Sequence, residues 1–258
     1  MHAEMPETLK VTADLRAFPI PEPYSEVLEQ GMMINAGLQD GLLVMARFHQ
    51  DHVDPQSFAR FGIPFDESLK RAVVSRRAEF LATRVLGKLM LRQLGLSETA
   101  IGRSADRSPI WPAGCRGAIS HTSGVCAVIA LRGAGGYAGV DVETIVGDQT
   151  RKEIAESILT PPEMALLGNL SEPEANHLLT LLFSAKETLF KALYPQVLRF
   201  FGFECAQMVA PPQGGQLGLR LTTGLTPDLT AGRAFHLRYM EHDCKILTWM
   251  TNDTCQTK

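Results

Sequence analysis

The sequence predicts an α+β protein of two lobes, each with one long helix packed on a small antiparallel sheet. Each half of the 258 residues contains one long stretch of helical periodicity and several short β-prone runs, and no internal repeat is present. The segment Gly133-Ala134-Gly135-Gly136 has the weakest tendency to order in the interior of the chain. We therefore expect an N-terminal lobe over residues 1–134 and a C-terminal lobe over residues 135–258.

The first half begins with a predicted extended arm, followed by one strand and one long helix. Alternating prolines up to Pro23 block a helix, and the apolar run Gly41–Phe48 favours a strand. Apolar residues at helical spacing predict a helix from Leu69 to Leu94, which Gly95 ends.

A loop and a hairpin are expected next. Residues 103–117 are rich in Ser, Pro and Gly and predict a loop. Two β-prone runs on either side of Ser123-Gly124 predict a hairpin, with Ser120 and His121 at its tip.

The second half is organised around a predicted helix from Pro173 to Tyr194. Ser171 and Glu174 fit a capping box at its start, and Tyr194-Pro195 is a stop signal. Short β-prone runs follow, and we expect an antiparallel sheet with strands over residues 203–209, 217–222, 235–240 and 246–250.

Two further segments precede this helix. Strand alternation in Ala138–Glu143 places Asp141 and Glu143 on one face. Thr160-Pro161-Pro162-Glu163 has the capping residues of a short helix.

Composition excludes several classes of protein. The formal net charge of -3 disfavours nonspecific nucleic-acid binding, so any anion site must be local. No apolar run is long enough to span a bilayer, and the first residues do not resemble a signal peptide. The five cysteines have no metal-binding or paired spacing, which indicates free thiols and a cytoplasmic location.

Three carboxylates form the candidate metal site. Asp141 and Glu143 on a strand, with Glu187 from the long helix, could bind one Mg2+ through oxygen ligands. The sequence also offers cations that would suit a phosphate ligand: Lys186, Lys191, His121, Arg76, Arg84 and Arg103. Two alternatives stay open. Glu187 and Lys191 could form a solvated pair, and Arg76 and Arg84, with Arg77, Lys88 and Arg92, could line a solvated helix face.

Five motifs in one order identify a family. The motifs are Arg76-Arg77-Ala78-Glu79-Phe80-Leu81-Ala82-Thr83-Arg84, Ser108-Pro109-Ile110-Trp111-Pro112-Ala113-Gly114, Ala118-Ile119-Ser120-His121, Gly139-Val140-Asp141-Val142-Glu143 and Phe183-Ser184-Ala185-Lys186-Glu187. Together they resemble the 4'-phosphopantetheinyl transferases. The nearest branch contains the transferase component of enterobactin synthase, and the resemblance spans about Arg76 to Val209.

This resemblance implies a fold of two pseudo-symmetric α/β lobes with coenzyme A and Mg2+, or alternatively Mn2+, between them. It implies transfer of the 4'-phosphopantetheine arm from coenzyme A to a serine of an apo carrier protein, with release of 3',5'-ADP. The expected carriers are peptidyl or aryl carriers of siderophore-type nonribosomal peptide synthesis, with acyl carriers as an alternative. We expect a monomer that binds neither nucleic acid nor membrane.

The resemblance also assigns residues. Asp141, Glu143 and Glu187 would bind the metal, with Glu187 as the base and Lys191 stabilising charge on the pyrophosphate. The remaining coenzyme A contacts, besides Asp141 and Lys191, would be Arg76, Arg84, Arg103, Ser108, Pro109, Ser120, His121 and Lys186.

Four alternatives remain at this point, two for the function and two for single segments. An inactive relative would bind coenzyme A or a carrier without transfer, and a Mg2+-dependent phosphatase or nuclease could use the same three acids. Ser120 and His121 could be a simple turn. Leu198, Phe200 and Phe201 could dock a carrier helix or belong to the core.

Overall fold

The structure is a computed structural model that describes residues 14–51 and 53–252. Its contacts divide these residues into two compact units, residues 14–138 with Asn252, and residues 139–251. The boundary predicted from the glycine-rich segment lies slightly earlier, after residue 134. The part of the predicted arm before residue 14 lies outside the described residues.

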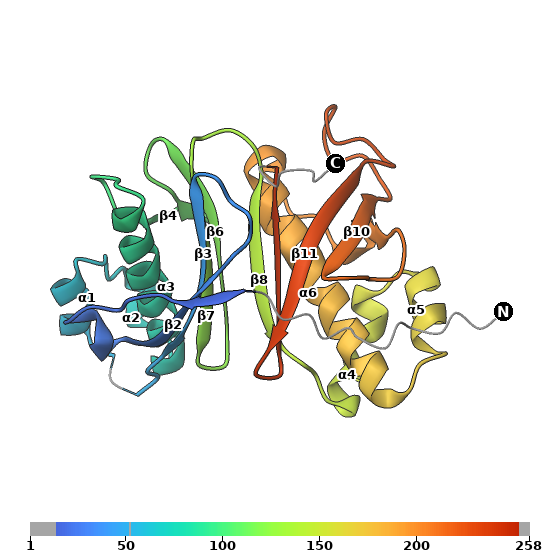
Figure 1. The fold of residues 1–258 in the computed structure, drawn as a ribbon, viewed down its shortest axis with the longest axis horizontal. Helices are drawn as coiled ribbons and strands as arrows, with labels where there is room; N and C mark the ends of the chain where they lie inside the picture. Colours follow the sequence, from blue (N-terminus) through green and yellow to red (C-terminus); the bar gives the residue numbers. More distant parts are fainter. Residues whose placement is uncertain (1–13, 52, 253–258) are drawn as a thin grey trace. The chain divides into compact units, whose positions relative to one another are not determined.

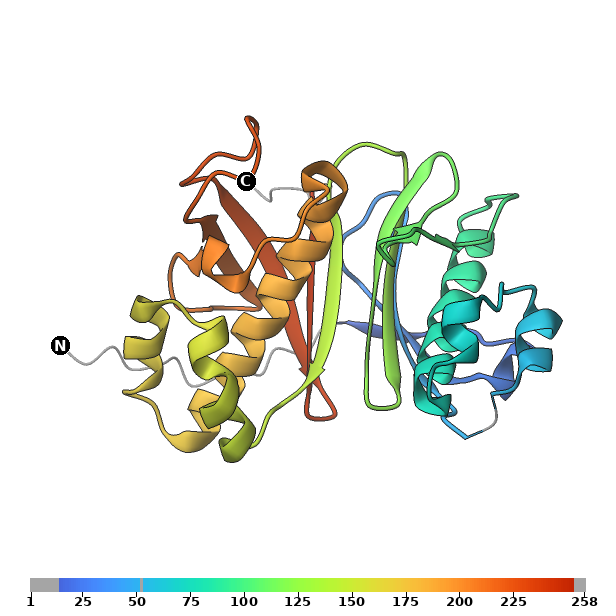
Figure 2. The same cartoon turned by 180° about the vertical axis from the view of Figure 1, so that it is seen from behind.

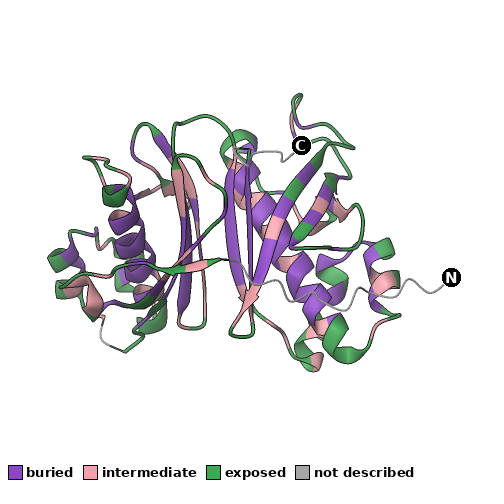
Figure 3. Cartoon of the chain, in the orientation of Figure 1, coloured by how far each residue is buried: buried purple, intermediate pink, exposed green. Residues whose placement is uncertain are grey.

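The N-terminal unit is a five-stranded antiparallel sheet with a long helix, α3, on one face (Figure 1). The strand order is β1-β2-β3-β7-β6. Apolar side chains from α3 and from the central strands β3 and β7 form the core, which Figure 3 shows as buried segments. The elements are β1 (Leu15–Ala17), the 3-10 helix η1 (Tyr24–Glu26), β2 (Leu28–Ile34), β3 (Gly41–Phe48), α1 (Pro55–Phe61), α2 (Glu67–Lys70), α3 (Val74–Gln93), β4 (Gly102–Arg103), β5 (Pro109–Ile110), β6 (Cys115–Thr122) and β7 (Val125–Arg132).

The predicted helix from Leu69 to Leu94 is wrong at its start, because two helices occupy this range. Short α2 ends at Lys70, and α3 begins after Val73, whose backbone is extended. The Arg77 side chain donates from Nε to the Leu69 carbonyl at 2.9 Å and from Nη2 to the Lys70 carbonyl at 2.7 Å. The Leu69 carbonyl also accepts from the Ala72 N–H at 3.1 Å. Arg77 therefore adds side-chain donors at the carbonyl end of α2, so a side chain of α3 stabilises the break.

The hairpin is confirmed, but its tip is not where we expected it. Strands β6 and β7 turn at Ser123-Gly124, with Gly124 at a φ of 68°. Ser120 and His121 therefore lie within β6, opposite Ala127 and Cys126. The preceding segment is not entirely a loop, because Arg103 of β4 pairs with Pro109 of β5.

The C-terminal unit repeats the same plan, with α6 on one face of a sheet in the order β8-β12-β11-β10-β9 (Figure 2). Thr188 and Ser184 of α6 hydrogen-bond to the Thr248 hydroxyl of β12 at 2.6 and 2.9 Å, all fully buried. The elements are β8 (Ala138–Thr144), α4 (Asp148–Ile158), α5 (Pro161–Leu167), α6 (Glu172–Val197), the 3-10 helix η2 (Phe203–Cys205), β9 (Ala206–Met208), β10 (Gln216–Leu221), β11 (Ala234–His242) and β12 (Lys245–Thr251).

The capping boxes of α5 and α6 are confirmed, but the predicted end of α6 is wrong. The helix continues through Pro195 to Val197 and stops at Leu198, which has a left-handed backbone with φ 51°. Proline removes one helical N–H, yet the Leu198 N–H still bonds the Tyr194 carbonyl at 2.8 Å, so the last turn closes. The expected strand at 203–209 starts later, because residues 203–205 form η2.

Candidate functional site

The predicted site residues fall into two clusters, one in each unit. The carboxylates lie on β8 and α6 of the C-terminal unit, and most of the predicted cations lie in the N-terminal unit.

Helix α6 approaches β8 closely at Gly139. A Cβ atom there would lie 2.3 Å from the Thr188 carbonyl oxygen and 2.9 Å from the Ala192 Cβ. Only glycine permits this approach, which brings the Asp141 side chain to α6. Lys191 of α6 donates from Nζ to Asp141 Oδ1 at 2.6 Å, and Asp141 is 1% exposed.

The three predicted acids influence one another electrostatically. Burial raises the pKa of Glu143 to about 8. The negative charges of Asp141 and Glu187 also raise this pKa, and the positive charge of Lys191 lowers it. Burial also raises the pKa of Glu187, which Lys191 lowers and Asp141 raises. The carboxylates are therefore neighbours, and Lys191 is their shared cation. Lys191 interacts with the buried Asp141 as well as with Glu187, so it is more than the partner of one solvated pair.

The carboxylates do not form a finished metal site. Within the described ranges, no group of three or more His, Cys, Asp or Glu side chains stands in an arrangement that could hold a metal ion. Their oxygen donors and the repulsion among them still match the chemistry of a hard divalent cation.

Lys186 requires a correction. Its Nζ donates to Glu163 Oε2 at 2.7 Å and to the Ile158 carbonyl at 2.8 Å, and both charged side chains are 1% exposed. The Lys186 ammonium group is therefore bound to Glu163 and to a backbone carbonyl inside the protein, and we no longer assign it to a coenzyme phosphate. Glu163 also accepts from the Thr160 and Met208 backbone N–H groups, at 2.8 and 2.7 Å, so it ties α5, α6 and β9 together.

A small pocket of about 50 Å³ lies beside Glu187 in this unit. Phe190, Phe200 and Phe203 contribute to its lining. Phe200 is 81% exposed and Leu198 is 72% exposed, whereas Phe201 is buried. Two of the three residues that we predicted as a docking patch or core are therefore on the surface.

The second cluster, in the N-terminal unit, is cationic. Arg76 Nη1 lies 2.6 Å from His121 Nε2, and because a guanidinium only donates, this ring nitrogen is the acceptor. Glu79 joins both residues, at 3.1 Å from Arg76 Nη1 and 3.5 Å from His121 Nδ1. Glu79 was not among the predicted site residues, although its spacing of three from Arg76 on a helix is typical of an ion pair.

Arg84 belongs to the same cluster and is 6% exposed. Its Nε has no hydrogen-bond partner, and no carboxylate among the described residues pairs with it. Burial lowers the pKa of Arg84 to about 10, and the charges of Arg103 and Arg76 lower it further. The expectation of a solvated arginine face is thus wrong for Arg84, which is a buried cation beside two others.

The remaining predicted contacts in this unit lie at the start of β5 and on β6. Pro109 pairs with Arg103 in the two-stranded sheet, and Ser108 Oγ hydrogen-bonds to Ser104 Oγ and to Asp106, both at 2.8 Å. Ser120 is buried on β6.

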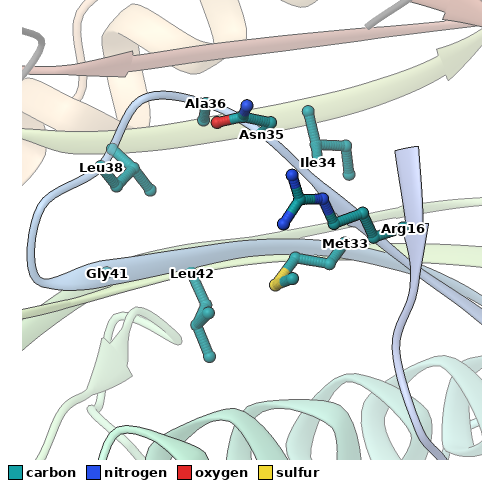
Figure 4. Close-up of a pocket in the computed structure, with 8 residues that line it drawn as sticks. All are labelled: Arg16, Met33, Ile34, Asn35, Ala36, Leu38, Gly41 and Leu42. Carbon is teal, nitrogen blue, oxygen red and sulfur yellow. The ribbon is translucent and has the colours of Figure 1, made fainter. Parts of the chain in front are cut away.

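A separate pocket of about 350 Å³ lies on the N-terminal unit. Figure 4 shows that its lining comes from the first three strands and the connection between β2 and β3, with Arg16, Asn35 and Leu42 among the residues. It contains none of the predicted site residues.

No described helix has both the length and the apolar character required to cross a bilayer.

Comparisons with known proteins agree with the resemblance found in the sequence. The 4'-phosphopantetheinyl transferase N-terminal domain matches residues 65–131, and the 4'-phosphopantetheinyl transferase superfamily matches residues 137–238.

Three relatives illustrate the similarity. Enterobactin synthase component D of Salmonella typhimurium is 32% identical over 208 residues, which cover 78% of this chain and 84% of that protein. The 4'-phosphopantetheinyl transferase Npt of Nocardia iowensis is 34% identical over 155 residues, or 59% of this chain and 68% of Npt. PptT of Mycobacterium tuberculosis is 33% identical over 141 residues, or 54% of this chain and 61% of PptT. The chain belongs to the 4'-phosphopantetheinyl transferase superfamily and is an enzyme of that transferase class.

Proposed function

We propose that this transferase moves the 4'-phosphopantetheine arm of coenzyme A to a serine of an apo carrier protein, depends on Mg2+ and releases 3',5'-ADP. The observation that carries the proposal is the cluster on β8 and α6, where Lys191 and three neighbouring carboxylates are brought together. The enterobactin synthase relatives favour peptidyl or aryl carriers of siderophore-type peptide synthesis over acyl carriers.

In this proposal the carrier serine attacks the β-phosphorus of coenzyme A. A new O–P bond forms to the serine, the bridging P–O bond breaks, and 3',5'-ADP leaves. Glu187 takes the serine proton, directly or through water. Its raised pKa suits a general base, because the proton is transferred to a group with appreciable basicity. Lys191 neutralises negative charge that grows on the leaving phosphate.

Asp141, Glu143 and Glu187 would hold the Mg2+ ion, with Mn2+ as the alternative. The fit rests on their oxygen donors and on the raised pKa of Glu143, which burial causes first and the charges of Asp141 and Glu187 increase. When bound, the ion would neutralise charge on the diphosphate.

The cationic cluster on α3, β4 and β6 binds a phosphate of coenzyme A in this proposal. A buried Arg84 without a carboxylate partner supports this role, since its charge is left for a ligand. Arg76, Arg103 and His121 would share the phosphate. Ser120, Ser108 and Pro109 would contact the rest of the nucleotide.

The exposed side chains of Leu198 and Phe200 support carrier docking next to Glu187. An apolar face of a carrier helix would cover them and bring its serine to the base. Phe200→Ala should raise KM for the carrier and leave KM for coenzyme A unchanged.

Intact-mass analysis tests the proposal. The protein is incubated with coenzyme A, Mg2+ and a panel of apo peptidyl, aryl and acyl carriers, with parallel reactions in EDTA and with Mn2+. We expect addition of the phosphopantetheine mass to peptidyl or aryl carriers, loss of transfer in EDTA and recovery on adding Mg2+. Transfer that persists in EDTA contradicts the metal assignment, and hydrolysis of coenzyme A without carrier loading contradicts the function.

We also propose a cytoplasmic monomer. Cys115, Cys126, Cys205 and Cys244 are free thiols, which suits a reducing compartment. Light scattering during size-exclusion chromatography would measure the mass of the particle.

A further inference from the structure

Arg84 and Arg103 are two neighbouring positive charges in the N-terminal unit. Both are largely removed from solvent, Arg84 at 6% exposure and the Arg103 side chain at 16%. The charge of Arg103 lowers the pKa of Arg84, in addition to the larger effect of burial, because like charges repel strongly where water is scarce. Other side chains must therefore hold the two guanidiniums in place.

The ring of Phe80 lies next to both. Phe80 precedes Arg84 by one helical turn on α3, and the Arg84 Cζ is 4.4 Å from the ring centroid. The Arg103 Cζ is 5.7 Å from the same centroid. An aromatic face attracts cations, so this single ring offsets part of the repulsion between the two side chains.

Asp66 and Ser68 also contact Arg103. Arg103 Nη1 donates to Ser68 Oγ at 2.6 Å and lies 3.5 Å from Asp66 Oδ2. Asp66 is itself fixed, because its Oδ1 accepts from the Leu69 backbone N–H at 3.0 Å and from Ser68 Oγ at 2.6 Å. The bond from the Leu69 N–H makes Asp66 the N-cap of the short helix α2, which lies just before the break.

We propose that Phe80 and Asp66 are positioning residues that hold Arg84 and Arg103 as a pair to bind one phosphate group, the phosphate on the ribose of coenzyme A. The two planar guanidiniums offer forked donors that match phosphate oxygens. This inference rests on the proposed function for the identity of the ligand, coenzyme A.

Phe80 also belongs to the core, where its ring stacks on Phe58 at a centroid distance of 6.3 Å. A test must therefore separate positioning of the arginines from simple packing. Dephospho-coenzyme A makes this possible, because it lacks only the phosphate on the ribose.

The experiment measures Kd of the full-length protein for coenzyme A and for dephospho-coenzyme A by calorimetry. We expect the unmodified protein to prefer coenzyme A. Phe80→Leu should weaken coenzyme A binding about tenfold and leave dephospho-coenzyme A binding unchanged. Phe80→Tyr keeps the aromatic face and should retain the preference.

Phe65→Leu is the matched control. Phe65 contacts Phe58 in the same aromatic cluster at 4.7 Å, but its neighbouring cation is Arg77. This variant should affect both ligands equally. Asp66→Asn, at an exposed position, repeats the test without disturbing the core and should also reduce the preference.

The outcomes distinguish the positioning role of Phe80 and Asp66 from the phosphate site itself. If the unmodified protein prefers coenzyme A and both Phe80→Leu and Asp66→Asn keep that preference, the positioning role is wrong and the phosphate site stands. If the unmodified protein binds both ligands equally, the phosphate site itself and the inference both fail.

Discussion

Gly139 on β8 lies so close to Thr188 on α6 that a Cβ atom at residue 139 would stand 2.3 Å from the Thr188 carbonyl oxygen. This approach sets the separation between the strand that carries Asp141 and Glu143 and the helix that carries Glu187 and Lys191. Gly139→Ala should therefore push the two elements apart, destabilise the protein by about 1–3 kcal/mol and lower transfer activity.

Urea unfolding and carrier loading measure the two effects of Gly139→Ala. Gly135→Ala is the control, since nothing lies within 4 Å of a Cβ there. Equal stability of both variants would contradict the packing argument.

Glu187→Gln should leave the fold intact and abolish most transfer. The substitution keeps the shape of the side chain but removes a base and a carboxylate ligand, so kcat should fall about 100–1000-fold. Loading assays and the melting temperature measure the result. Glu156→Gln, exposed on α4, should behave like the unmodified protein. Near-normal loading by the Glu187 variant would refute both roles.

Lys191→Met should reduce kcat and also stability. It removes the 2.6 Å bond to the nearly buried Asp141, which costs about 1–3 kcal/mol, and it removes the cation that offsets the neighbouring carboxylates. Single-turnover kinetics and urea unfolding measure the two effects. Lys152→Met changes a lysine whose side chain is 62% exposed and should change neither quantity. Unchanged kcat in Lys191→Met would contradict the charge-stabilising role.

Lys186→Met should destabilise the protein by about 3–5 kcal/mol, because it leaves the Glu163 charge buried without its cation. Adding Glu163→Gln to this variant should restore part of the stability, since a neutral amide replaces the uncompensated carboxylate. Chemical denaturation of both single variants and the double variant measures the coupling. If the double variant is as unstable as the sum of the two single variants, the ion pair has no energetic role.

Local patterns in the sequence predicted most of the elements. Strand Gly41–Phe48 and the capping boxes at Thr160 and Ser171 follow from neighbouring residues, and they are confirmed. The break before Val74 and the continuation of α6 through Pro195 were missed. The break is stabilised by the Arg77 side chain, which binds the carbonyls of Leu69 and Lys70. The helix continues past Pro195 because the Leu198 N–H still bonds the Tyr194 carbonyl.

The sequence by itself determined the family, the two-lobed α+β class and which residue types carry the chemistry, because motif order and hydrophobic periodicity are local properties of the chain. Only the tertiary structure decided which charges face each other. It pairs Lys186 with Glu163 in the interior and Lys191 with Asp141. It also brings Arg84 next to the Phe80 ring and to Arg103. The physical reason is that burial and pairing depend on residues distant in sequence, whose separation no local pattern encodes.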